Sequence, residues 1–178
     1  MESKAKLIGH AVHPMLIVFP LGLLTFSVIA DVVGMVTPHA QWREFAYWLI
    51  AGGVVGGVLA AIAGLIDWAA IPFGTRAKAI GTMHGLGNLA VIALFAISGV
   101  MRRDNPAAPG AIPFILSVIA LGMVMATGWL GGELVDRLGV GVDNGAHLNA
   151  PSSLSGRPAS DSVDPNAAHS DTPETALH

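Results

Sequence analysis

Seven side chains in this sequence combine useful chemistry with positions beside or inside strongly apolar runs: His10, His13, Asp67, His84, Asn88, Trp129 and Glu133. Imidazole and carboxylate groups ligate divalent metals, and paired imidazoles hold haem iron. The chain has no cysteine, which excludes disulfides, thiolate sites and covalent c-type haem attachment. Histidine and carboxylate side chains are therefore the main candidate ligands.

His84 and Asn88 are spaced by four residues in the segment HGLGN, at the start of an apolar run over 79–100. On a helix they point the same way, one turn apart. A histidine within an apolar slab is costly, and it usually faces a bundle interior or a watery cavity. We expect His84 to mark the site, with Asn88 either beside it or bonded between helices. A purely structural hydrogen bond from His84 is the alternative.

His10 and His13 precede the first apolar run, at a spacing that suits a metal on a continuous helix. Pro14 follows directly, and a proline pushes the preceding residue out of helical geometry. Both histidines are thus either ligands or polar residues of a solvated turn. Asp67 and Glu133 fall near the ends of later runs, where an interfacial charge is the simpler explanation of each alone.

The composition indicates a membrane protein. Of 178 residues, 53% are hydrophobic and only 12% are charged, about half the usual share of charged residues. Nine Lys and Arg and a net charge of -3 exclude the basic patch that nucleic-acid binding needs. No serine nucleophile motif or phosphate-binding loop argues for a hydrolase, and enzymatic activity is left open.

Four apolar runs predict an all-α integral membrane protein, an up-down-up-down four-helix bundle. We place the spans at about 14–36, 45–68, 79–100 and 112–135, within a transmembrane domain over 1–141. Pro20 should kink the first span. Small residues every fourth position in the second span predict close packing against a neighbour. The polar segment 142–178 is expected to be a disordered tail.

Alternating spans bring the candidate residues toward one membrane face. At the other face lie Asp31, His39, Arg43, Glu44, Arg102 and Arg103, which we interpret as ordinary interface charges. Both termini should share one side. The positive-inside rule favours the cytoplasm for them, because five cations lie on that side, Lys4, Lys6, Arg76, Lys78 and Arg137, against Arg43, Arg102 and Arg103.

Three segments resemble a widespread bacterial family of predicted four-span membrane proteins of unknown function: HAVHPMLIVFPLGL at 10–23, HGLGN at 84–88 and GWLGGELVDRLGVGV at 128–142. The resemblance covers about residues 9–150 and implies the bacterial inner membrane but no activity. Many relatives have a further histidine in a segment like Arg-His-Gly-Val-Gly-Val, where this chain has Leu138. If that histidine is a ligand elsewhere, the site here is differently built. The family is also broadly similar to small haem-b-binding membrane proteins, a likeness of fold alone.

Three functions fit these observations. One is electron transfer through one haem b or a divalent metal. Haem would use His13 and His84, with His10 the alternative to His13 and Asn88 a further candidate, and a metal would use the histidines with Glu133 or Asp67. The second needs no cofactor: a scaffold, partner subunit or sensor that packs against another membrane protein or a second copy. The third is a small-solute or proton pathway lined by the same polar residues.

Overall fold

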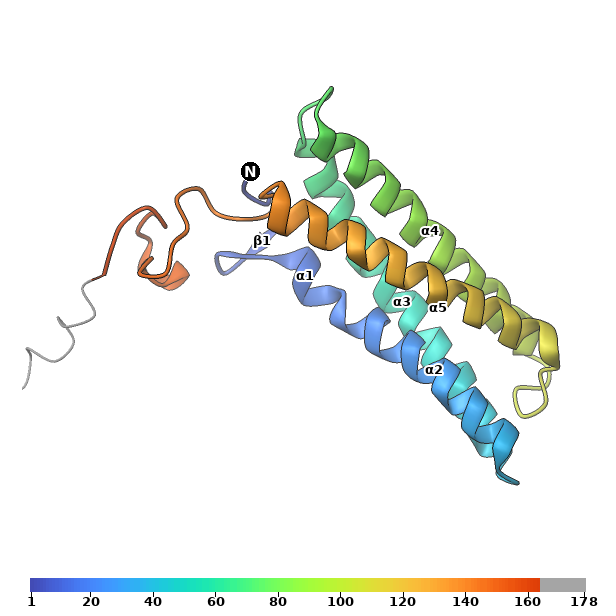
Figure 1. Cartoon of the computed structure of the whole chain (residues 1–178). Coiled ribbons are helices and arrows are strands. Elements are labelled where there is room, and N and C mark those ends of the chain that lie inside the picture. Colours follow the sequence, from blue (N-terminus) through green and yellow to red (C-terminus); the bar gives the residue numbers. More distant parts are fainter. Residues whose placement is uncertain (164–178) are drawn as a thin grey trace, which may run out of the picture.

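A computed structural model describes residues 1–163 (Figure 1). Within these residues, four helical segments are long and apolar enough to cross a membrane: Val12–Val36, Gln41–Ala70, Arg76–Arg102 and Ala111–Arg137. Each of the four predicted spans lies inside one of them. The predicted four-helix membrane bundle is confirmed.

Proline interrupts the first span. It consists of α1 (Val12–Leu16) and α2 (Val18–Val36), with Ile17 between them. Pro20 has no backbone N–H, so the carbonyl of Leu16, four residues earlier, loses its helical partner. The remaining long helices are α3 (Gln41–Ala70), α4 (Arg76–Arg102) and α5 (Ala111–Gly132), the last continued by a π-helical turn, η1 (Glu133–Arg137). Contrary to the expectation from Pro14, His13 lies inside a helix, in the first turn of α1.

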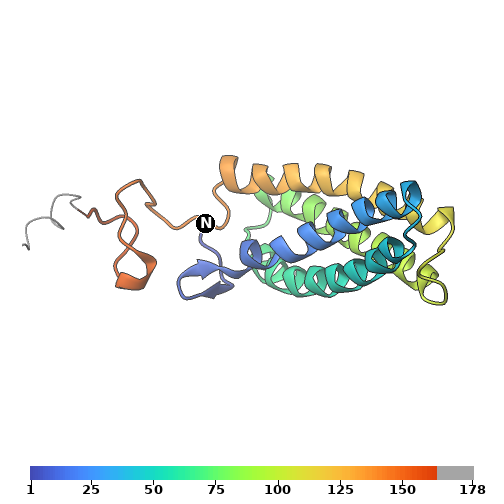
Figure 2. The same ribbon diagram turned by 90° about the horizontal axis from the view of Figure 1, so that it is seen from below.

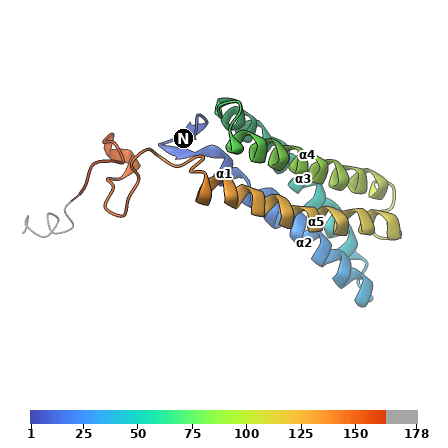
Figure 3. The same ribbon diagram turned by 45° about the horizontal axis from the view of Figure 1, so that its top comes forward.

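The helices pack in a ring. Neighbours in sequence are neighbours in space, and α5 closes the ring with a smaller contact against α2. Figure 2 shows the helices side by side, with the N-terminal segment and the end of α5 at the same end. Figure 3 shows α4 and α5 running together. The first span and α4, which the sequence leaves as either adjacent or diagonal, therefore lie across the diagonal.

Small residues of α3 let the first span approach closely, as predicted. A Cβ added at Gly53 would lie 2.5 Å from a side-chain carbon of Leu24. One added at Gly56 would lie 3.2 Å from Phe19. These distances are at or below van der Waals contact, so the glycines set how near the two helices can come.

A buried ion pair joins α2 to α4 at the end of the bundle away from the N-terminus. Arg102 donates to both carboxylate oxygens of Asp31, each over 2.7 Å, and the two side chains are 0% and 1% exposed. Ser98 and Ser117 accept further hydrogen bonds from the guanidinium. The interpretation of Asp31 and Arg102 as interface charges is therefore wrong. A single sequence shows two charges near span ends but not that they face each other.

The residues before the first span form a short β-hairpin. Strand β1 (Lys6–Leu7) pairs antiparallel with β2 (His10–Ala11). Residues 142–163, the described part of the predicted tail, contain one short 3₁₀ helix, η2 (Ser153–Ser155), and touch this hairpin. The rest of the predicted tail, 164–178, lies outside the described residues.

Breaking the buried ion pair should destabilise the protein severely. Removing one partner leaves an uncompensated charge, which costs about 3–5 kcal/mol. We expect Arg102→Met alone, or Asp31→Leu alone, to lower the thermal unfolding midpoint in detergent. The combined Asp31→Leu, Arg102→Met variant should recover most of that loss, because it leaves no orphaned charge. A double variant as unstable as the sum of the single ones would contradict this explanation.

Candidate functional site

His13 is held by α3. Its Nδ1 lies 2.8 Å from the backbone carbonyl oxygen of Ala60. A carbonyl oxygen only accepts, so Nδ1 carries the proton and Nε2 has the lone pair. A Cβ added at Gly64 would lie 2.9 Å from this Nδ1. The missing side chain at Gly64 of α3 thus leaves the space that the imidazole of His13 occupies.

His84 is held in the same way by α5. Its Nδ1 lies 2.9 Å from the carbonyl oxygen of Thr127, so Nδ1 again carries the proton. A Cβ added at Gly131 would meet the ring at 3.1 Å. The predicted partner Asn88 is one turn further along α4, and its side-chain amide nitrogen lies 3.1 Å from Nε2 of His84. The helical spacing in the sequence identified Asn88 as a partner of His84. It did not indicate that the carbonyl oxygen of Thr127 accepts the hydrogen bond from Nδ1.

The two imidazoles meet across the diagonal of the bundle. Their ring centres are 6.3 Å apart and the ring planes are nearly perpendicular, at 83°. Both side chains are partly buried. Because each Nδ1 bonds to a different helix, α3 or α5, each Nε2 edge is turned away from the helix that holds its ring. The structure thus brings together His13, His84 and Asn88.

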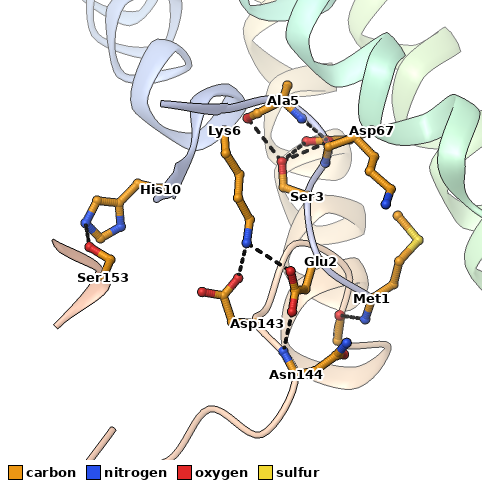
Figure 4. Close-up of polar contacts among 12 residues, drawn as sticks. Met1, Glu2, Ser3, Ala5, Lys6, His10, Asp67, Asp143, Asn144 and Ser153 are labelled. Carbon is orange, nitrogen blue, oxygen red and sulfur yellow. Dashed lines mark hydrogen bonds and ion pairs between the residues drawn. The ribbon is translucent and has the colours of Figure 1, made fainter. Parts of the chain in front are cut away.

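The other predicted ligands have different partners. His10 is exposed and its Nε2 lies 3.2 Å from the hydroxyl oxygen of Ser153 (Figure 4). Asp67 receives the Ser3 hydroxyl at 2.8 Å and the backbone N–H groups of Lys4 and Ala5 at 2.7 and 3.1 Å. Asp67 therefore anchors the N-terminal segment to the end of α3.

Glu133 binds Arg76 at 2.5 Å, which ties η1 to the start of α4. Trp129 is 67% exposed and lies on the outer surface of α5. Among residues 1–163, no group of three or more His, Asp or Glu side chains is placed to hold a metal ion. The structure therefore does not gather the candidate metal ligands into one such group: His10, His13, Asp67, His84 and Glu133.

The sequence profile of one family, described as a predicted membrane protein (DUF2231), matches residues 9–144. The chain belongs to the DUF2231 family. No curated protein and no solved structure matches it. The DUF2231 match begins just before His10 and ends after η1. It includes His13 and His84 and the glycines that contact their rings, Gly64 and Gly131.

Polar contacts outside the membrane hold the N-terminal segment against residues 139–144 (Figure 4). The backbone N–H of Asn144, followed by Lys6, lowers the pKa of Glu2 below its ordinary 4.5. Asp143, followed by Glu2, raises the pKa of Lys6 above its ordinary 10.5. Glu2, whose pKa is lowered in the folded protein, stabilises the contact fully above pH 4.5. This stabilisation is lost as the pH falls through the lowered pKa. Lys6, whose pKa is raised in the folded protein, stabilises the contact fully below pH 10.5. This stabilisation is lost as the pH rises through the raised pKa.

These pKa shifts predict a contact that is complete from weakly acidic to weakly alkaline pH. Spin labels at Lys4→Cys and Ala146→Cys, in a chain without other cysteines, should give a narrow distance distribution at neutral pH. The distance distribution should broaden below pH 4.5, as the pH falls through the lowered pKa of Glu2. In the matched Glu2→Gln variant we expect the broad distribution already at neutral pH. If the distribution broadens in acid but stays narrow at neutral pH in the Glu2→Gln variant, Glu2 does not hold the contact.

Proposed function

We propose that this protein binds one haem b between His13 and His84 and transfers electrons in the membrane. The observation that carries the proposal is the facing pair of imidazoles, 6.3 Å between ring centres, each with Nδ1 bonded to a carbonyl. This is the tautomer in which Nε2 can bind iron. A hydrogen bond from the distal nitrogen is also what normally orients a ligating histidine.

The spacing of the two rings would suit an iron-centred group held between His13 and His84. Two metal–nitrogen bonds of about 2 Å in line, with about 1.1 Å from each nitrogen to its ring centre, put the ring centres about 6 Å apart. Two imidazoles on a tetrahedral ion would have ring centres only about 5 Å apart. The observed 6.3 Å corresponds to the first arrangement.

The number of ligands also favours haem over a divalent ion. A bare zinc-like ion takes about four ligands, whereas a porphyrin supplies four nitrogens and needs two axial groups from the protein. Within residues 1–163 the pair has Asn88 beside it but no carboxylate in a metal-binding group. Gly64 and Gly131 add no bulk where the imidazoles rest.

The chain's own residues would set the properties of such a centre. The carbonyl oxygens of Ala60 and Thr127 fix the ring orientations, and Asn88 must release Nε2 of His84 before that atom can bind iron. A haem held by both His13 and His84 would supply one-electron transfer.

Haem binding is tested by expressing the protein with haem supplied and recording its absorption spectrum in detergent. We expect a bis-imidazole spectrum with one haem per chain. His13→Ala or His84→Ala should remove the low-spin spectrum, because each deletes one axial ligand. Asn88→Ala keeps both imidazoles and should retain it.

Two histidines outside the pair are matched controls. His10→Ala and His39→Ala both change exposed side chains, and neither should alter the spectrum. A folded wild-type protein that stays colourless under these conditions would overturn the haem proposal. The histidine pair would then be a structural contact, and the scaffold and pathway hypotheses would remain.

For the orientation we propose cytoplasmic termini in the bacterial inner membrane. Arg102 is buried in its ion pair and Lys78 is buried against the carbonyl oxygen of Trp68, so neither acts as a loop charge. The positive-inside comparison becomes four cations against Arg43 and Arg103. A fluorescent protein fused to the C-terminus should therefore be bright, since it folds in the cytoplasm, and an alkaline phosphatase fusion inactive. The opposite pattern would reverse the assignment.

A further inference from the structure

The two imidazoles of the pair differ in what lies beside their Nε2 atoms. Among residues 1–163, Nε2 of His13 has no hydrogen-bond partner, whereas Nε2 of His84 lies 3.1 Å from the side-chain amide nitrogen of Asn88. Nδ1 of His84 already donates to the carbonyl oxygen of Thr127, so Nε2 can only accept and the amide of Asn88 donates. The nitrogen of His84 that could bind a ligand therefore already has a partner within the protein.

Asn88 acts on His84 and not on the packing of the helices. A polar side chain inside an apolar span is costly, and it usually bonds to a neighbouring helix. The side chain of Asn88 makes one hydrogen bond within residues 1–163, and its partner is four residues earlier on the same helix, α4. Removing the amide therefore takes no hydrogen bond away from the contacts between helices.

The amide of Asn88 has space to turn away from His84. On an α-helix a side chain lies over the preceding turn, which for Asn88 contains His84 and Gly85. A Cβ added at Gly85 would meet no atom within 4 Å. The amide can therefore move from His84 toward the space beside Gly85 without displacing another side chain.

We propose that Asn88 blocks Nε2 of His84 in the haem-free protein, so that a ligand of the pair binds His13 first and His84 only after the amide has turned away. This role rests on the proposed function, haem binding, and makes Asn88 a positioning residue that acts through His84. The block lowers the affinity for haem, because binding at His84 must replace an existing hydrogen bond. A typical hydrogen bond corresponds to about a 2- to 10-fold change in an equilibrium constant.

The block also gives the site selectivity. While Asn88 bonds to His84, the pair offers one free imidazole nitrogen, that of His13. One nitrogen is too few for a zinc-like ion, which takes about four ligands. A group that binds both imidazoles can still displace the amide.

The first test uses the full-length, haem-free protein in detergent at neutral pH. Diethylpyrocarbonate attaches to the unprotonated nitrogen of an imidazole, and mass spectrometry measures the rate at each histidine. Asn88→Leu removes the amide but keeps a side chain of similar volume. His84 should then be modified several-fold faster, while His13 and the exposed His10 keep their rates. The matched control is Thr82→Val, which removes a different hydrogen bond of α4 and should change none of these rates.

The second test measures haem affinity from the absorption spectrum. Asn88→Leu should bind haem several-fold more tightly than the wild type, because no amide competes for Nε2 of His84. In a His84→Ala background the same Asn88→Leu change should leave the affinity unaltered, since the nitrogen that Asn88 blocks is absent. Circular dichroism of each variant verifies that the fold is retained.

Three outcomes would overturn the role of Asn88. One is an unchanged modification rate at His84 in the Asn88→Leu protein. The second is weaker haem binding by Asn88→Leu, which would mean that Asn88 supports the site. The third is an effect of Asn88→Leu that persists without His84. A wild-type protein that binds no haem would overturn the proposed function instead, and the modification rates would still decide whether Asn88 blocks His84.

Discussion

The bundle depends on two polar contacts across its diagonal, where helix backbones do not pack directly. At one end Asp31 and Arg102 form a fully buried, bidentate ion pair. Toward the other end His13 and His84 face each other. Hydrophobic burial does not distinguish one helix register from another in lipid, because the surroundings are as apolar as the core. Buried polar contacts do, since a shifted helix would leave a charge or an imidazole without a partner.

The ring of helices gives the two contacts different roles. The ion pair is saturated: its serine neighbours satisfy the guanidinium, and no buried side-chain polar atom within residues 1–163 lacks a partner. In the histidine pair, the carbonyl oxygens of Ala60 and Thr127 accept hydrogen bonds from the two Nδ1 atoms and Asn88 bonds Nε2 of His84, so within residues 1–163 only Nε2 of His13 has no hydrogen-bond partner. The ion pair therefore only holds the helices together, whereas Nε2 of His13 can still bind a further group.

Much of this arrangement could be predicted from the sequence. Long apolar runs fixed the four spans, and periodic small residues located the face of α3 that packs on the first span. His84 with Asn88 followed from helical spacing alone. The partners of Asp67 and Glu133 could not be predicted, because both residues satisfy their charge with nearby loop or helix-end groups that carry no sequence signal. The Asp31–Arg102 pair was missed because the two residues are 71 positions apart.

That sequence separation has a consequence for biogenesis. Asp31 leaves the ribosome two spans before Arg102. When the first two spans are inserted into the bilayer, the side chain of Asp31 therefore still lacks its counterion. The ion pair can form only once the third span has been inserted, so the helix register that it fixes is set late in assembly.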